Sequence, residues 1–309
     1  MVKFCRSMQS DAALRREVRV MRHWIATLLV VLGANDVCAD APVFQWSDNS
    51  VGWRYGTKFR EPYNTHDITK NILSLTHADG WKYGGNFLNV DLLLSDKNDP
   101  KDCDSDGCSG RAKEVYVLYR GTLSLNKISG GDYKVGPVRD WGLTFGLDWN
   151  SKNDAGYNSR KRMFVLGPTM NLDVPGFFDV SVLALWESNA PCSNYPGGSC
   201  EPRYRYNTHP ALSLTWGIPL GSSGFNVQGY TMWIASKGRD EFGGKTAPET
   251  HFDGALMYDI GHAAGGPKAK YKIGVGYEYW RNKFGNPYHG PAGNGAFAKT
   301  PMIRAEFHF

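Results

Sequence analysis

The sequence has no apolar run of the about 18 residues that a membrane-spanning helix needs, although 41% of its 309 residues are hydrophobic. Beyond the first 39 residues it also shows no helical periodicity of useful length. It contains no glycine-rich phosphate loop and no Gly-x-Ser-x-Gly nucleophile motif. The lack of a long apolar run excludes a helical membrane protein. Because the sequence has neither a phosphate-binding loop nor a nucleophile motif, we expect that the protein is not an enzyme and binds no cofactor.

The longest apolar run, residues 24–33, lies near the N-terminus. Arg22 and His23 precede this run, and the small-residue segment 37–39 follows it. A basic start, a short apolar centre and small residues at the cut are typical of a secretory signal peptide. We therefore expect export from the cytoplasm and cleavage after Ala39.

The leader sets the domain boundary and accounts for most of the net charge. Residues 1–20 are charged and precede Met21, so we expect an overextended gene start there and a signal peptide at 21–39. No repeat or proline-rich linker divides residues 40–309, which are expected to form one domain. Without the leader the chain has 29 basic and 27 acidic residues, a balance that gives no indication of nucleic-acid binding.

Four cysteines remain after the leader, and they form two local pairs in polar, turn-rich stretches. Because an exported protein meets an oxidising compartment, we predict the loop disulfides Cys103–Cys108 and Cys192–Cys200. A zinc site is the weaker alternative, since the spacings fit no finger and no histidine is close by. No metal site is expected.

Period-2 alternation dominates the rest of the chain. Residues 141–149 alternate Trp, Leu and Phe with Gly, Thr and Asp, and residues 271–279 alternate Tyr, Ile and Val with Lys, Gly and Glu. Such alternation is typical of strands whose two faces differ. We expect twelve strands, at residues 51–59, 68–78, 85–95, 113–125, 141–149, 161–172, 177–188, 204–217, 225–236, 251–261, 271–279 and 303–309.

The direction of the apolar faces distinguishes a soluble sandwich from a membrane barrel, where they point outward to lipid. Tyr and Trp gather at strand ends, as interfacial girdles do, and Gly and charged residues share the polar faces. We therefore predict an all-β fold, a transmembrane antiparallel β-barrel of about 12 strands with up-and-down topology. Its expected place is the outer membrane of a Gram-negative bacterium, with Trp53, Phe145, Val275 and Phe307 facing lipid.

The chain ends on its last expected strand, with a terminal Phe309. In a closed barrel this strand pairs with the first one, so no edge remains. A final strand with an aromatic terminus resembles the signal by which outer-membrane proteins are assembled. Barrel-assembly machinery and outer-membrane lipid are therefore expected partners.

Two stretches resemble a known family: residues 44–56, FQWSDNSVGWRYG, and residues 135–150, which begin VGPVRDW and end GLDWN. Together with the closing strand they resemble the Tsx-like nucleoside channel family, and more closely its proteobacterial "outer envelope protein" branch. The resemblance implies a twelve-stranded barrel whose narrow, aromatic-lined pore passes nucleosides. We accordingly expect a passive channel for small polar solutes, with a nucleoside as the solute.

The polar faces of the expected strands supply the candidates for the solute path. Their charged groups equally suit an internal salt-bridge network that fills the lumen, as in a structural or surface-interaction barrel. A lipid-modifying barrel enzyme is a third hypothesis, with less support because the histidines are scattered along the chain. Aromatic rings among the candidates are expected either to stack on a base or to pack against neighbours. The candidates are Arg54, Lys58, Asp91, Glu114, Tyr116, Arg120, Asp148, Glu187, Tyr230, Asp253, Glu278, Trp280, Arg304 and Glu306.

Overall fold

A computed structural model describes residues 43–309 except 101–110, 195–196 and 267–268. Val43–Phe309 forms one compact unit. The expected signal peptide and the expected disulfide between Cys103 and Cys108 lie outside the described residues.

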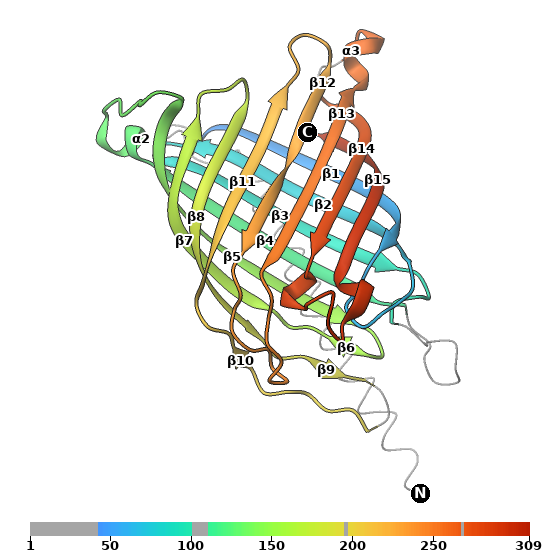
Figure 1. Ribbon diagram of the computed structural model, residues 1–309. Helices are drawn as coiled ribbons and strands as arrows, with labels where there is room; N and C mark the ends of the chain where they lie inside the picture. Colours follow the sequence, from blue (N-terminus) through green and yellow to red (C-terminus); the bar gives the residue numbers. More distant parts are fainter. Residues whose placement is uncertain (1–42, 101–110, 195–196, 267–268) are drawn as a thin grey trace, which may run out of the picture. The chain divides into compact units, whose positions relative to one another are not determined.

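Twelve long strands form one closed antiparallel barrel (Figure 1), which confirms the predicted fold class. Each strand pairs with its neighbour in the chain, and β15 pairs with β1 to close the sheet, for example Gly52 with Glu306. The barrel strands are β1 (Phe44–Phe59), β2 (Ile68–Trp81), β3 (Gly84–Ser95), β4 (Lys113–Ser124), β5 (Val138–Asn153), β7 (Arg162–Leu172), β8 (Phe177–Asn189), β11 (His209–Pro219), β12 (Phe225–Ile234), β13 (Glu249–Asp259), β14 (Tyr271–Arg281) and β15 (Phe297–His308).

The two ends of the barrel differ in their connections (Figure 1). The turn end carries the shorter connections, the helices α2 and α3 and the C-terminus, and the loop end carries the longer ones. In outer-membrane barrels the shorter turns face the periplasm and the longer loops face outward. No described helix is long and apolar enough to cross a membrane. The short elements are α2 (Leu125–Ser129) and α3 (Ile260–Ala264) at the turn end, and β6 (Tyr157–Asn158), β9 (Cys192–Ser193), β10 (Tyr204–Arg205), η1 (Lys283–Gly285) and η2 (Gly293–Ala296) at the loop end.

The strand boundaries differ from the expected ones in two informative places. The strand expected at 204–217 begins only at His209, because Tyr204 and Arg205 form the separate strand β10 beside β8. The last strand begins at Phe297, six residues before the expected start at 303. Both differences lie at the loop end, where pairing with neighbouring strands, rather than alternation, decides how far a strand extends.

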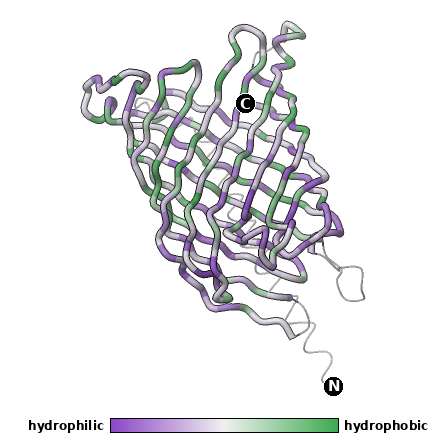
Figure 2. Tube along the Cα trace, viewed as in Figure 1, coloured by the Kyte–Doolittle hydropathy of each residue, from purple (hydrophilic) through white to green (hydrophobic). Residues whose placement is uncertain are grey.

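The two faces of each strand point as predicted. On the outer face Leu147 and Val275 are 56% and 59% exposed, whereas Thr144 and Arg304, on inner faces, are 5% and 8% exposed. Figure 2 shows the same alternation as hydrophobic and hydrophilic colours along the strands. The exposed apolar side chains form the lipid-facing surface of a transmembrane barrel.

The inner face is not uniformly polar, which corrects the expected polar lumen. Two apolar clusters lie inside the barrel, and their members contact one another as residues in the core of a soluble protein do. They pack the space between buried charged groups near the loop end. One comprises Met163, Val165, Leu183, Leu185 and Ala211 with Met232 and Ile234, and the other Phe59, Ile68, Ile72 and Met302 with Leu93.

Cys192 and Cys200 form a disulfide, as the sequence predicted. The bond lies in the connection between β8 and β11, and the short strand β9 of this connection pairs with β6. It therefore fixes the base of the segment that leads into β10.

The orientation of the strands predicts opposite effects for one substitution on the two faces. Val275→Arg places a charge among lipid tails and should lower the free energy of unfolding by about 2–4 kcal/mol if the position lies near the bilayer centre. Gln228→Arg places the same charge in the lumen, where Gln228 already contacts the Glu306 carboxylate at 2.6 Å, and should be tolerated. Urea unfolding in lipid vesicles measures both. Equal losses would contradict the assignment of faces.

Candidate functional site: the lumen

The middle of the lumen contains a cluster of two arginines and two aspartates. Arg54 and Arg304 are direct cross-strand neighbours on β1 and β15. The Arg54 guanidinium lies 2.5 Å from Asp91 and 3.7 Å from Asp253, and Arg304 forms an ion pair with Asp253. Because like charges directly opposite destabilise a sheet, the two carboxylates are what allows two arginines to share this position.

Glycines make room for the luminal arginines. A Cβ at position 276 would lie 2.2 Å from Arg304 Nε, and a Cβ at position 146 would lie 2.7 Å from Arg120 Cδ. Each arginine therefore lies over a glycine of the neighbouring strand. This explains why glycine and charge alternate together on the polar faces.

A second group lies on β4 and β5. The Tyr116 hydroxyl donates to Asp148 at 2.6 Å, and Arg120 Nη1 lies 2.5 Å from the other oxygen of the same carboxylate. Asp148 is buried, so it depends on both donors. The sequence thus predicted three residues that the structure brings together.

Side chains from strands and loops fill the lumen near the loop end. Glu61, from the loop after β1, lies 2.7 Å from Lys70 and 3.2 Å from Lys283. Asp99, from the loop after β3, lies 3.0 Å from Lys152 and 3.8 Å from Lys70. All five groups are strongly shielded from water, and we call them the outer plug.

A further ion cluster on the same inner surface is centred on Glu187. The Lys237 ammonium, from the connection after β12, donates to it at 2.8 Å, while Lys161 and His209 lie 3.8 and 3.9 Å away. Lys237 and His209 are 3% and 2% exposed. Lys237 and Lys161, which both come from connections between strands, therefore occupy this part of the lumen as well.

Stacked rings join the outer plug to the middle of the lumen. His251 stacks on Trp280 with ring centres 3.8 Å apart, and the Lys283 ammonium lies 4.7 Å from the centre of the same indole. Tyr230 contacts His251 edge to face. Trp280 therefore presents a free face to a solute only when Lys283 moves.

The remaining candidates occupy separate places. Glu114 accepts from Asn150 at 2.6 Å, Glu306 accepts from Gln228, and Glu278 lies 3.7 Å from His251. Within the candidate set, two buried polar atoms, one oxygen of Glu278 and Arg304 Nε, have no hydrogen-bond partner among the described residues. Both atoms are shielded from solvent in this conformation, so a polar solute reaches them only after neighbouring side chains move.

Lys58 is the exception among the candidates. A β-bulge between Gly56 and Phe59 shifts the pairing of β1 with β2. Phe59 consequently turns inward and is 2% exposed, while Lys58 is exposed. The assignment of Lys58 to the lumen was wrong because simple alternation does not account for a bulge.

Three aromatic rings near the turn end were missed. Trp46, Phe87 and Phe177 are 55%, 40% and 44% exposed and share their strand faces with Asp48, Asp91 and Asp179. Each ring is two or four residues away from an inward-facing aspartate, and residues at such even spacings lie on the same face of a strand. This spacing could have identified them from the sequence. The lumen is therefore accessible at the turn end, in contrast to the loop end.

Trp46 and Phe87 lie on either side of β2, where the side chains are small. Register places Asp48 opposite Ala78 and Ala78 opposite Phe87, and Trp46 lies over Gly80. The next neighbour of Phe87 is Arg120, on β4. We call Trp46 and Phe87 the aromatic shelf.

The Gly-Pro-Val-Arg-Asp-Trp motif has a structural role at the turn end. Asp140 accepts from the Ser124 hydroxyl at 2.5 Å and from the Asn126 amide at 3.1 Å. Ser124 in turn caps α2 by accepting from the Lys127 amide. The motif thus fixes the turn between β4 and β5.

No family model and no curated relative matches the sequence. Among solved structures the chain is similar to the translocator domain of the autotransporter NalP from Neisseria meningitidis, with 11% identity, a TM-score of 0.44, and 97% and 98% of the two chains covered. It is also similar to the KdgM porin, with 10% identity, a TM-score of 0.40, and 84% and 99% covered. Pseudomonas aeruginosa OccK5 matches with 10% identity, a TM-score of 0.30, and 87% and 99% covered. Likenesses at this level carry no conclusion about activity.

The ionisation of Glu61 makes the outer plug sensitive to acid. Burial by itself would raise the pKa of Glu61, but the positive charges of Lys283, Lys70 and Lys152 outweigh it and hold the pKa well below its ordinary value of 4.5. A carboxyl whose pKa is lowered by folding stabilises the protein fully above its unfolded value, and this contribution declines as the pH falls below that value.

Glu61→Gln should therefore lower the free energy of unfolding by about 3–5 kcal/mol at neutral pH, because it removes the carboxylate that pairs with buried Lys283 and the nearer of the two that pair with buried Lys70. The difference from wild type should shrink below pH 4.5. Asp67→Asn is the matched control, since Asp67 pairs with Arg60 in the same loop but is half exposed, and should cost at most about 1 kcal/mol. A pH-independent loss for Glu61→Gln, measured by urea unfolding, would contradict the ion-pair assignment.

Proposed function

We propose that the protein is a passive outer-membrane channel for small polar solutes, and that its solutes include nucleosides. The aromatic shelf is the observation that carries the proposal. Trp46 and Phe87 are large rings that are 55% and 40% exposed inside the barrel, and such ring faces can take up a flat heterocycle at about 1–3 kcal/mol per base.

Polar groups beside the shelf suit the sugar of a nucleoside. Arg120 is the cross-strand neighbour of Phe87 and is held by Asp148, which also accepts from Tyr116. Further along the lumen, Glu278 and Arg304 each have a buried atom without a partner among the described residues. A nucleoside matches these groups in order along the lumen, because its base has flat ring faces for the aromatic shelf and its sugar has hydroxyls for the polar side chains.

The resemblance of residues 44–56 and 135–150 to the Tsx-like family supplies the nucleoside as substrate. The residues alone favour only a flat, polar solute. Outer-membrane placement, assembly through the strand that ends in Phe309, and the lumen candidates as a solute path belong to the same proposal.

The outer plug keeps the channel closed in this conformation. Its anchors Glu61 and Asp99 come from loops, so passage requires a loop movement rather than a change of the barrel wall. Lys283 is central, because it contacts Glu61 and also covers the ring of Trp280. Its displacement would open the path and free an aromatic face together.

A structural barrel with a permanently filled lumen is the second candidate. The apolar cluster around Ile68 and Met302 favours it, because its buried side chains pack together inside the loop end of the barrel. The two functions differ in whether the filled section ever opens.

Planar-bilayer recordings of the purified protein, with and without nucleosides, test the proposal. We expect small conductance steps that nucleosides block, and more frequent openings for Lys283→Met. Phe87→Ala should weaken block about tenfold, from the loss of roughly 1–2 kcal/mol of stacking. Phe225→Ala is the matched control, since Phe225 is also 40% exposed but lies on the outer face.

Three outcomes would count against parts of this proposal. An absence of conductance in both wild type and Lys283→Met would favour the structural barrel. If the protein conducts ions but nucleosides leave the conductance unchanged, the channel proposal stands and the assignment of nucleosides as its solutes is wrong. If Phe87→Ala and Phe225→Ala weaken the nucleoside block equally, the aromatic shelf does not bind the nucleoside.

A further inference from the structure

Four arginines gather on the outer wall of the barrel at the loop end. Arg162 on β7 and Arg205 on β10 are the cross-strand neighbours of Ser188 on β8, one on each side. Arg203 donates to the Ser188 hydroxyl at 3.1 Å and to the carbonyl oxygen of Arg160 at 3.0 Å. All four arginines are exposed, and we call them the rim arginines.

The rim arginines are close to one another, and the residues that the structure describes give them no acidic partner. None of them forms an ion pair within the described part of the chain, whereas the exposed cation Lys134 does. Partial burial and the positive charges of Arg162 and Arg160 lower the pKa of Arg203. Four like charges held together in this way favour an anion of matching size.

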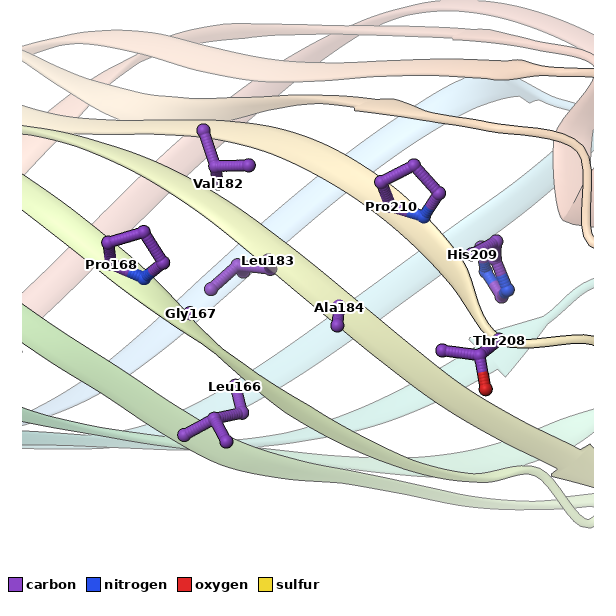
Figure 3. Close-up of a pocket in the computed structure, with 9 residues that line it drawn as sticks. All are labelled: Leu166, Gly167, Pro168, Val182, Leu183, Ala184, Thr208, His209 and Pro210. Atoms are coloured by element: carbon purple, nitrogen blue, oxygen red, sulfur yellow. The ribbon is translucent and has the colours of Figure 1, made fainter.

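An apolar hollow lies on the outer wall of the barrel (Figure 3). It has a volume of about 360 Å³ and is lined by side chains of β7 and β8 and the start of β11. Leu166, Pro168, Val182 and Pro210 surround the small side chain of Ala184, which leaves the space open. The hollow is continuous with the lipid-facing surface.

Two rings separate the rim arginines from the hollow. Phe164 and Trp186 are cross-strand neighbours with ring centres 5.5 Å apart, and both are about two-fifths exposed. Arg162, Phe164 and Leu166 are successive outward residues of β7, so charge and hollow lie about 13 Å apart at 3.3 Å per residue. Charge, aromatic belt and apolar surface thus follow one another along the wall.

We propose that this face binds a membrane lipid with a phosphorylated headgroup, namely the phosphorylated glycolipid of the outer leaflet. Its phosphates contact the rim arginines, which recognise phosphate with paired donors, and one acyl chain occupies the hollow. The position suits that leaflet because the rim arginines lie at the loop end, which faces outward in barrels of this kind. Such a lipid fixes the connection that carries Arg203 and Arg205 to the barrel wall.

Titration of the detergent-purified full chain with diphosphorylated lipid A, followed by native mass spectrometry, tests the site. Arg162→Gln/Arg205→Gln should weaken binding about 30-fold, which corresponds to about 1 kcal/mol for each arginine. Ala184→Phe, which fills the hollow and leaves every arginine in place, should also weaken it. Dephosphorylated lipid A should bind poorly, and millimolar inorganic phosphate should not displace the intact lipid.

Arg281→Gln/Lys299→Gln is the matched control, because both residues are exposed outer cations at the loop end of β14 and β15. It should leave binding unchanged. Unaltered affinity of the Arg162/Arg205 variant, an equal loss in the control, or displacement by inorganic phosphate would each overturn the proposal. If the double variant does not fold, Arg162→Gln alone should give about a fivefold loss. The assay needs no conductance, so its failure and that of the channel proposal are distinguishable.

Discussion

Every backbone amide inside a bilayer needs a partner in the protein, because lipid offers none. The pairing of β15 with β1 meets this requirement by closing the sheet, so no strand edge faces lipid. Closure also means that each strand residue points either to the lipid or to the lumen. Arg54 and Arg304, which meet at the closing pair of strands, must therefore both point inward, and the rest of the luminal chemistry follows from the need to neutralise such groups.

The inward-facing groups are accommodated differently in the two halves of the lumen. Near the loop end, inward-folded loops bring Glu61 and Asp99 to buried lysines, and apolar side chains occupy the remaining space. Near the turn end the wall is lined by small residues and hydroxyls, including the hydrogen-bonded series Thr122, Thr144 and Thr169. The aromatic shelf is accessible there, since Trp46 is 55% and Phe87 is 40% exposed. A filled outer half and an accessible inner half are what the proposed channel requires of its closed state.

The barrel, its strand number and the direction of its faces could be predicted from the sequence, because period-2 alternation together with an expected signal peptide leaves few alternatives. The pairs of Arg54 with Asp91 and of Arg120 with Asp148 were predicted only as members of a set, since register decides which groups meet. Lys58 was assigned wrongly because a bulge is invisible to simple alternation. The contribution of Glu61 and Lys283 was missed because loops carry no periodic signal.

The central claim is that the lumen is accessible at the turn end and closed at the loop end. Labelling of Phe87→Cys with a bulky maleimide–polyethylene glycol tests it most directly, in intact cells and in outer-membrane fragments that expose both faces. Ile128→Cys on α2 and Phe242→Cys at the loop end are exposed references for the two ends. The account predicts that Phe87→Cys reacts, like Ile128→Cys, only in fragments. Labelling of Phe87→Cys in intact cells as fast as that of Phe242→Cys would contradict it.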